Sequence, residues 1–338
     1  MGREERGIRS RGHSGRSARV LSICVIVPAA GSGSRLGSAD PKALVRLNGK
    51  SLLARSLEAI ISSGVASSIV VAAPEEFLTR ARSEIDIISE SGLKDSEASI
   101  SGIRITVVAG GDDRIESVQS ALKYAGSADI VLIHDAARAL TPSDVFRRVA
   151  AAVRAGAEAV VPVLPMTDTV RRAQSRPAVN SDQSSTATDV PSAPLPRSDP
   201  NGRQNMVESG ADSDPEFPTV EVLHGDLDRS RLRRVQTPQG FTAATLRRAH
   251  EEYDHDQATS SSGGLGATDD AGLVERLGVD VVAVDGDEEA LKITYPLDLV
   301  LGEHIAKQRD GTARDTKQRD GTADDTRRDA TSESGPRR

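Results

Sequence analysis

The chain of 338 residues has one cysteine, no tryptophan and few other aromatic residues. A single cysteine, Cys24, excludes an intrachain disulfide, and its place in an apolar run is typical of a small buried side chain in a cytoplasmic protein. An aromatic content of 2% argues against nucleic-acid binding by base stacking. No apolar stretch approaches the ~20 residues of a membrane span. We therefore expect a cytoplasmic protein with no nucleic-acid or membrane partner.

Three segments lack the apolar residues that a folded core needs. Residues 1–19 are rich in Arg, Gly and Ser, and the segment at about 174–221 holds seven of the sixteen prolines. The tail at 307–338 contains a ten-residue repeat without Val, Ile, Leu or aromatic residues. Such compositions cannot offset the entropy of ordering. We expect a disordered N-terminal extension, one folded domain over 20–306 with a low-complexity insertion, and a disordered repeat tail.

The N-terminal arginines allow a second interpretation. Six arginines between Arg3 and Arg19 precede the apolar run at 20–30, a pattern that imitates a secretory signal. Cleavage there would remove the glycine loop that follows, so we favour a retained segment. A mature N-terminus near Gly31 would reverse this interpretation.

The rest of the chain alternates between short β-branched runs and helical patterns. Strands are predicted at 23–28, 68–73, 103–109, 130–134 and 159–163, with helices between them at 52–63, 75–89, 115–124 and 143–155. Shorter strand pieces at 235–237, 281–284 and 293 accompany helices at 243–253, 270–277 and 296–306. Repeated β-α-β units predict an α/β fold with a doubly wound, mostly parallel sheet.

The most informative motif follows the first predicted strand. Residues 28–36 read Pro-Ala-Ala-Gly-Ser-Gly-Ser-Arg-Leu, and Pro41-Lys42 come soon after. Small residues at the end of a strand let a nucleotide approach the backbone, and Arg35 and Lys42 supply positive charge for phosphates. Because the net charge is −7, an anion must be bound by such local charge. The motif predicts a nucleoside triphosphate site.

Three further motifs follow predicted strands, where ligands bind in open α/β sheets. In 110–117 the glycines admit a ligand, and Asp112 and Ser117 can bind ribose or base; a turn before a helix is the alternative. In 134–138 Asp135 suits Mg²⁺ and Arg138 suits an anion; a surface ion pair is the alternative. Thr169 can donate to a phosphate or hydroxyl, or belong to a turn.

Four further candidates lie beyond the insertion and complete the set. They are Arg229, Gln-Thr-Pro-Gln-Gly at 236–240, Thr-Asp-Asp-Ala at 268–271 and Lys-Ile-Thr at 292–294. Lys292 lies among apolar residues, where a lysine either extends its amine to water or is held against an anion; we favour the anion. The histidines lack metal-site spacing, so no structural zinc is expected. The chain has no complete Gly-x-x-x-x-Gly-Lys-Ser/Thr motif, which excludes a P-loop.

Taken in order, these motifs closely resemble those of the 2-C-methyl-D-erythritol 4-phosphate cytidylyltransferases, over roughly 22–305 without the insertion. The resemblance implies a Rossmann-like nucleotidyltransferase fold with a β-arm, which the insertion interrupts here. It implies CTP and a polyol phosphate as substrates, Mg²⁺ as cofactor, and a homodimer whose arms exchange between subunits. The reaction is attack of the acceptor phosphate on the α-phosphorus of CTP, with loss of pyrophosphate.

The resemblance also assigns roles to residues of this chain. The catalytic residues are Arg35, Lys42 and Lys292, and Asp135 also contacts Mg²⁺. The nucleotide is bound by Ala29, Ala30, Gly31, Gly33, Gly111, Asp112, Ser117 and Ala136. The acceptor is surrounded by Asp135, Arg138, Thr169, Arg229, Thr237 and Thr268; near Arg229, three further arginines at 231, 233 and 234 compete for its role.

Alternatives remain open at this point. A cytidylyltransferase for another polyol phosphate, such as ribitol 5-phosphate, shares the nucleotide loops, and a non-catalytic nucleotide-binding scaffold could use the insertion and tails for docking. A dehydrogenase fits poorly, because the glycine spacing is wrong and the ribose-binding acid is absent. The tail is too short, and lacks the paired Asp and His ligands, for a fused cyclodiphosphate synthase. The insertion puts arm geometry and dimerisation in doubt.

Overall fold

The computed structural model describes residues 19–31, 33–38, 40–88, 97–100, 102–177, 219–259 and 268–312. Contacts divide the chain into a unit of residues Met1–Leu164 and Arg233–Arg338, here called unit 1, and a unit of residues Pro165–Leu232, here called unit 2. Among the described residues, none of the helices combines the length and hydropathy needed to cross a membrane.

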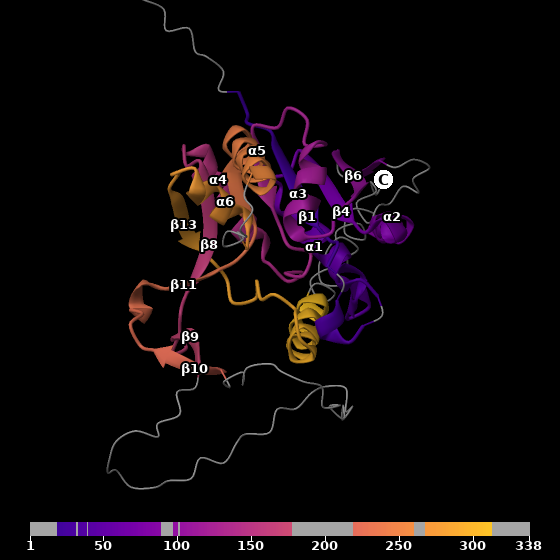
Figure 1. The fold of residues 1–338 in the computed structure, drawn as a ribbon. Helices are drawn as coiled ribbons and strands as arrows, with labels where there is room; N and C mark the ends of the chain where they lie inside the picture. Colours follow the sequence, from indigo (N-terminus) through magenta and orange to yellow (C-terminus); the bar gives the residue numbers. More distant parts are fainter. Residues whose placement is uncertain are drawn as a thin grey trace, which may run out of the picture. The chain divides into compact units, whose positions relative to one another are not determined.

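Unit 1 is built on a nine-stranded sheet in the order β11-β8-β12-β7-β1-β4-β6-β5, with β13 also paired to β8 (Figure 1). Strand β1 pairs in parallel with β4 and β7, β4 with β6, and β13 with β8. Strands β12 and β5 run antiparallel to their neighbours. The strands are β1 (Ile23–Pro28), β4 (Ser68–Ala73), β5 (Glu97–Ile100), β6 (Ile103–Ala109), β7 (Ile130–Ile133), β8 (Ala159–Pro165), β11 (Arg233–Val235), β12 (Gln239–Thr242) and β13 (Val281–Asp285).

The central strands are apolar on both faces because helices cover both faces. In β1, Ile23, Val25 and Val27 pack into one core, whereas Cys24 and Ile26 pack into another. The first core includes side chains of α1 (Leu52–Ser63), α2 (Leu78–Ile88) and α4 (Ser143–Arg154). The second includes side chains of α3 (Arg114–Leu122), α5 (Ala243–Thr259) and α6 (Asp270–Arg276). This arrangement is the doubly wound sheet expected of fully buried parallel strands.

Helix caps fix the two helix starts nearest the candidate site. The Asp113 side chain accepts from the N–H of Glu116 at the start of α3. The Asp269 side chain accepts from the N–H of Gly272 at the start of α6. Because each cap satisfies an otherwise free backbone donor, the following residues, Arg114 and Asp270, take fixed places in their first turns.

In a third apolar cluster, the helix at residues 296–312 packs against the segment around residues 47–52. Leu47 and Leu52 pack with Ile293 and Ala306; Leu47 lies in β2 (Arg46–Leu47), which pairs with β3 (Lys50–Ser51). The buried Arg55 of α1 bonds Asp310 at 2.7 Å near the end of that helix. The helix thus continues into the segment that the composition assigned to a solvated tail.

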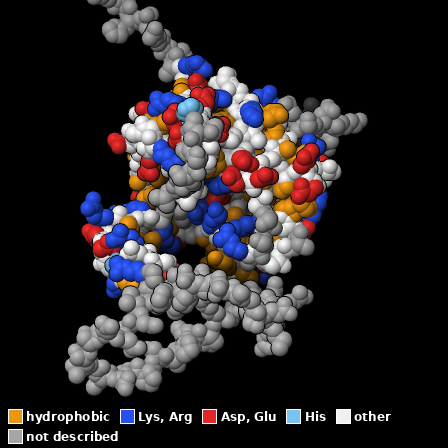
Figure 2. Space-filling model, viewed as in Figure 1, with side chains coloured by type: hydrophobic (Ala, Val, Ile, Leu, Met, Phe, Trp, Pro, Cys, Tyr) orange, Lys and Arg blue, Asp and Glu red, His pale blue; other side chains and the backbone are white. Residues whose placement is uncertain are grey.

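Unit 2 contains an antiparallel pair, β9 (Arg172–Pro177) and β10 (Thr219–His224), whose register runs from Thr219 opposite Pro177 to His224 opposite Arg172. A short 3-10 helix, η4 (Arg229–Arg231), follows. Figure 2 shows basic and acidic side chains side by side on this unit. Its described residues include four acids and five exposed arginines, namely Arg171, Arg172, Arg176, Arg229 and Arg231.

The predicted fold class is confirmed, and most predicted elements lie within a few residues of the observed ones. The strands at 23–28, 68–73 and 103–109 and the helix at 52–63 have the predicted bounds. Ile293, expected in a strand, forms none; its N–H donates to the Ala137 carbonyl at 2.9 Å. Strands β9 and β10 extend into both ends of the expected insertion, and residues 178–218 lie outside the described part of the chain.

Candidate active site

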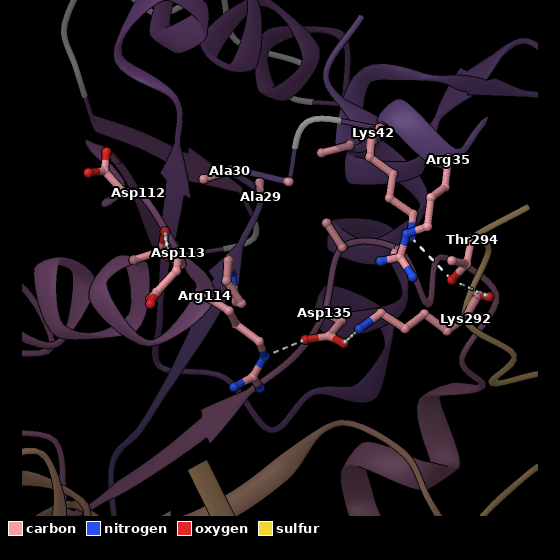
Figure 3. Close-up of a pocket in the computed structure, with 17 residues that line it drawn as sticks. Ala29, Ala30, Arg35, Lys42, Asp112, Asp113, Arg114, Asp135, Lys292 and Thr294 are labelled. Carbon is pink, nitrogen blue, oxygen red and sulfur yellow. Dashed lines mark hydrogen bonds and ion pairs between the residues drawn. The ribbon is translucent and has the colours of Figure 1, made fainter. Parts of the chain in front are cut away.

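A cavity of about 430 Å³ lies in unit 1 where β1 and β7 end and their loops begin (Figure 3). This volume is in the range of small-ligand sites. The residues after β1, the start of α3, the residues after β7 and the segment at 292–294 contribute to it. Its lining residues are Pro28, Ala29, Ala30, Gly31, Gly33, Arg35, Lys42, Ala43, Asp112, Asp113, Arg114, Ser117, Asp135, Ala136, Ala137, Lys292 and Thr294.

The glycine loop after β1 turns back on itself, so that Lys42 lies beside Gly31. The Ala29 N–H bonds the Ala72 carbonyl at 2.7 Å, and the Lys42 N–H bonds the Gly31 carbonyl at 3.1 Å. Gly33 has φ +72°, and a Cβ there would lie 3.1 Å from both the Asp40 carbonyl oxygen and the Lys42 nitrogen. Glycine at 33 is therefore required by backbone conformation and by space. This fold places Arg35 and Lys42 on the cavity.

Four cationic side chains line the cavity, and Figure 3 shows three of them, Arg35, Lys42 and Lys292, together on one side. The Lys42 amine donates to Thr294 Oγ1 at 3.4 Å, and Lys292 Nζ lies 2.9 Å from Asp135 Oδ2. Burial, together with the charges of Lys292 and Arg35, lowers the pKa of Lys42 to about 8. Among the described residues, neither Arg35 nor Lys42 forms an ion pair with a carboxylate. Arg35 and Lys42 are thus held near Lys292, and of the three only Lys292 has a carboxylate partner among the described residues.

Asp135 is the carboxylate between the cations. It follows β7, is buried, and lies 3.1 Å from Arg114 Nε on one oxygen and 2.9 Å from Lys292 on the other. Burial alone would raise the pKa of Asp135, but the Arg114 and Lys292 charges outweigh it and hold that pKa well below the usual range. Asp135 is therefore ionised at every pH at which an enzyme is ordinarily assayed.

Behind Asp135, His134 and Thr237 support the loop without lining the cavity. The Asp135 N–H donates to Thr237 Oγ1 at 3.1 Å, and the same hydroxyl lies 3.1 Å from His134 Nδ1. Complete burial lowers the pKa of His134 to about 3, so its ring is neutral near pH 7. The predicted site residue Thr237 therefore does not line the cavity; it supports the cavity residue Asp135 by accepting a hydrogen bond from the Asp135 N–H.

The loop before α3 forms the side of the cavity opposite the three cations in Figure 3. The buried Ser117 hydroxyl accepts from the Gly111 N–H at 3.2 Å, and the Asp112 N–H donates to Glu116 Oε2 at 2.8 Å. A Cβ at Gly110 would lie 2.9 Å from the Ser117 oxygen and 3.1 Å from the Ala30 Cβ. The glycines therefore allow this loop to pack against the loop after β1. Gly111, predicted as a nucleotide contact, is not among the lining residues.

The remaining predicted residues are not among the lining residues of the cavity. Arg138 donates to the Ala290 carbonyl at 2.7 Å and to the Val235 carbonyl at 3.2 Å, so both of its terminal nitrogens already bind backbone oxygens. Thr268 is exposed one residue before the cap of α6. Thr169 and Arg229 belong to unit 2, where Arg229 Nη1 donates to the Thr167 carbonyl at 2.8 Å.

The sequence reasoning missed Arg114, which the structure places at the centre of the charge network. Arg114 lies 3.1 Å from Asp135 and 2.5 Å from the fully buried Asp270, whose other oxygen is 3.0 Å from His250 Nε2. Asp113 and Thr294 were also not singled out, although both line the cavity. A signal existed for Arg114, because it belongs to the same motif as Asp112 and Ser117. Its partner Asp270 is distant in sequence, and no local pattern indicates the pair.

The chain is similar to known proteins over most of its length. The model of the 2-C-methyl-D-erythritol 4-phosphate cytidylyltransferase family matches residues 23–187 and 218–308. The chain belongs to this family. A 2-C-methyl-D-erythritol 4-phosphate cytidylyltransferase of Rhodococcus jostii is 38% identical over 289 residues, which are 85% of this chain and 96% of the relative. One of Streptomyces avermitilis is 40% identical over 285 residues, 84% and 91% of the two chains.

Solved structures agree with this family assignment. The crystal structure of 2-C-methyl-D-erythritol 4-phosphate cytidylyltransferase from Thermus thermophilus is similar with a TM-score of 0.52 and 29% identity, covering 85% of this chain and all of that one. The resemblance seen in the motifs is therefore confirmed for the family and the fold. The family match leaves out 188–217, within the segment expected as an insertion.

Proposed function

We propose that the protein transfers CMP from CTP to 2-C-methyl-D-erythritol 4-phosphate, giving 4-diphosphocytidyl-2-C-methyl-D-erythritol and pyrophosphate in the non-mevalonate route to isoprenoids. Membership of the cytidylyltransferase family supports the reaction. The structural observation that carries it is the convergence of Arg35, Lys42 and Lys292 on one cavity beside the glycine loop. Two phosphorylated substrates repel each other, and such a cavity offsets that repulsion.

The chemistry requires charge stabilisation more than proton transfer. An oxygen of the acceptor phosphate forms the new bond to the α-phosphorus of CTP, and the bond from that phosphorus to the bridging oxygen of pyrophosphate breaks. Because the acceptor phosphate is already ionised near neutral pH, no general base is needed. The cations stabilise the charge on the phosphoryl oxygens in the transition state. In this proposal Arg35 and Lys42 hold the triphosphate, and Lys292 lies where the two phosphates meet.

The nucleotide occupies the cavity between the loop after β1 and the loop before α3. Ala29, Ala30, Gly31 and Gly33 present backbone to the phosphates, and Asp112, Ser117 and Ala136 border the nucleoside. All of these residues line the cavity. Gly111 contributes indirectly, because its N–H is held by the Ser117 hydroxyl.

The acceptor side is assigned to Asp135, Arg138, Thr169, Arg229, Thr237 and Thr268. Support for this assignment comes from matching motif positions in the family. Arg138 and Thr237 also touch the loops that carry Asp135 and Lys292, through bonds to Ala290 and to the Asp135 N–H. Exchange of arms in a homodimer and a cytoplasmic location stay predictions from the sequence.

Mg²⁺ fits the cavity as an ion that arrives with the nucleotide. In the described ranges, no three His, Cys, Asp or Glu side chains come together as a metal site. Nucleotide-bound Mg²⁺ commonly uses one or two carboxylates, with phosphates and water as its other ligands. Asp135, ionised and on the cavity, is the residue that would hold it. When bound, Mg²⁺ supplies additional positive charge to the phosphates.

The decisive experiment measures pyrophosphate release from CTP and Mg²⁺ with either 2-C-methyl-D-erythritol 4-phosphate or ribitol 5-phosphate as acceptor. Reactions without acceptor, and with UTP in place of CTP, serve as controls. We expect turnover with CTP and 2-C-methyl-D-erythritol 4-phosphate. Preferential turnover of ribitol 5-phosphate would assign a different acceptor. Tight CTP binding without turnover of either acceptor would contradict the enzyme assignment in favour of a nucleotide-binding scaffold.

A further inference from the structure

A line of paired polar and charged side chains runs from the helix layer of unit 1 to the cavity. It begins at His250 on α5, continues through Asp270 on α6 and Arg114 on α3, and ends at Asp135 and Lys292. Each neighbouring pair is within 3.1 Å. Figure 3 shows the cavity end of this line, with Asp135 between Arg114 and Lys292. The line connects helices α5 and α6 with the candidate active site.

Asp270 is the least solvated member of the line. Its side chain is 0% exposed, its two oxygens are taken by Arg114 and His250, and it does not cap α6, because Asp269 does. Moving one partner away from a buried ion pair leaves an uncompensated charge, so the pair holds the Arg114 guanidinium in place. His250 is also buried, and its Nδ1 has no hydrogen-bond partner among the described residues. The one polar contact of that ring is therefore directed at Asp270.

Arg114 needs such an anchor because it lies between two carboxylates. Its Nε contacts Asp135 and its Nη1 contacts Asp270, and a planar guanidinium can serve both only in one orientation. If Asp270 lost its charge, the guanidinium would have Asp135 as its only anionic partner. Arg114 would then compete more strongly with Lys292, and with any ligand cation, for the Asp135 carboxylate.

We propose that Asp270, held by His250, is a positioning residue that fixes Arg114 and thereby keeps Asp135 shared between Arg114 and Lys292 in the productive arrangement. The proposal rests on the proposed cytidylyl transfer for its kinetic consequence, but its geometric content is independent of that reaction. It assigns a role in the transfer step to three residues, His250, Asp270 and Arg114, that the motif resemblance left without one.

The test compares Asp270→Asn with a control at a less buried carboxylate, Asp129→Asn. Asp129 is also in unit 1, where it lies just before β7 and binds Ser22. The cavity residue Asp135 lies beyond the other end of the same strand. We expect Asp270→Asn to lower kcat about 10- to 100-fold with the KM for the acceptor changed less than about threefold. Asp129→Asn should leave kcat within about twofold of the wild type, whatever it does to Tm. A fall in Tm with unchanged kcat for Asp270→Asn would show a merely structural role and overturn the proposal.

A double-mutant cycle with Arg114→Lys tests whether Asp270 acts through Arg114. Lysine keeps the charge but cannot bridge both carboxylates, so adding Asp270→Asn to Arg114→Lys should lower kcat by less than about threefold further. Full additivity of the two effects would contradict the proposal. His250→Gln, which keeps a donor toward Asp270, should retain more activity than His250→Leu.

The crystal structure of Asp270→Asn separates this proposal from the proposed function. If the wild type fails to turn over any acceptor, the transfer reaction is wrong but the geometry can still be read. We expect the Arg114 guanidinium to leave residue 270 and the contact between Lys292 and Asp135 to lengthen. An Arg114 that keeps its place in the variant would overturn the positioning role, whether or not the wild type is active.

Discussion

Two clusters of charged residues in unit 1 differ in how their charges are satisfied. In the contact between α1 and the C-terminal helix, the buried Arg55 donates to the Leu47 carbonyl at 2.8 Å and to Asp310 at 2.7 Å. The Arg55 guanidinium is therefore satisfied by hydrogen bonds within the protein. In the cavity, Arg35 contacts Tyr295 through its guanidinium at 5.9 Å from the ring centre, and Lys42 bonds a hydroxyl. Neither has a carboxylate partner in the described part of the chain.

The comparison separates charge that holds the fold from charge that is held for a ligand. A satisfied ion pair such as Arg55–Asp310 stabilises the packing of one helix on another. Cations kept close together without a carboxylate partner, as in the cavity, raise the free energy of the folded protein until an anion binds. Burial, together with the charges of Lys292 and Arg35, lowers the pKa of Lys42, and this lowered pKa expresses the cost of keeping the amine protonated. The two clusters should therefore respond to substitution in opposite ways.

The largest effect is expected in the cavity. Lys42→Ala and Arg35→Ala should each lower kcat at least ~10²-fold, because each removes a cation from the phosphoryl transition state. Neither should lower Tm, since removing one of several neighbouring cations relieves repulsion. Steady-state kinetics and thermal unfolding of the same preparations measure both quantities. Near-normal turnover in either variant would remove its assigned role.

The opposite response is expected at Arg55. Arg55→Met removes the hydrogen bonds to the chain near Leu47 and leaves Asp310 with the Asn48 amide but without the Arg55 charge, so the free energy of unfolding should fall by about 2 kcal/mol. At a temperature where the variant is folded, kcat should stay within about twofold of the wild type. Denaturant unfolding and kinetics test this pair of statements. A loss of kcat without a loss of stability would contradict the division between the two clusters.

A smaller effect is expected where the glycine loop supports the cavity. Gly33→Ala places a Cβ 3.1 Å from backbone atoms at a positive φ, so the loop must shift, and the affinity for CTP should fall roughly tenfold with a stability loss of about 1–2 kcal/mol. Gly37→Ala is the matched control, because Gly37 has φ +68° but no atom within 4 Å of its added Cβ. It should lose stability without losing CTP affinity. Equal affinities in the two variants would show that the close approach at Gly33 is unimportant.

The smallest effect is a dependence on pH. Because burial and neighbouring cations lower the pKa of Lys42 to about 8, this amine loses its proton as the pH rises through 8. The value of kcat/KM for CTP, which reports the free enzyme, should therefore fall roughly fivefold between about pH 8 and pH 9. In Lys42→Arg this decline should disappear, whatever the variant's activity near pH 7. A wild-type profile that is flat to about pH 9.5 would contradict a functional role for the Lys42 charge.

The sequence predicted the elements whose signal is local. The central strands are continuous apolar runs because both of their faces are buried, and helix α1 has a serine cap and a glycine end that define its bounds. The antiparallel strand β12 was missed, because four residues, Gln239–Thr242, carry too short a pattern. Its pairing with β7 and β8 is set by tertiary contacts.

In the candidate site, too, the residues with a local sequence signal were predicted and those brought together by tertiary contacts were not. The glycine loop, Lys42 and Asp135 were recognised because small or charged residues directly follow strands, and parallel strands bring those ends together. Arg114, Asp270 and His250 were not, because their association joins helices far apart in sequence. For Arg138, the sequence could predict a cation near the site, but not that the Ala290 and Val235 carbonyls would take its donors.

The most direct test of the central claim is a crystal structure of the protein with CTP bound. We predict that the triphosphate lies within hydrogen-bonding distance of the Arg35 guanidinium and the Lys42 amine, along the backbone of the loop after β1. The cytidine should lie beside Asp112 and Ser117. A triphosphate bound elsewhere, with Arg35 and Lys42 left without an anionic partner, would contradict the account.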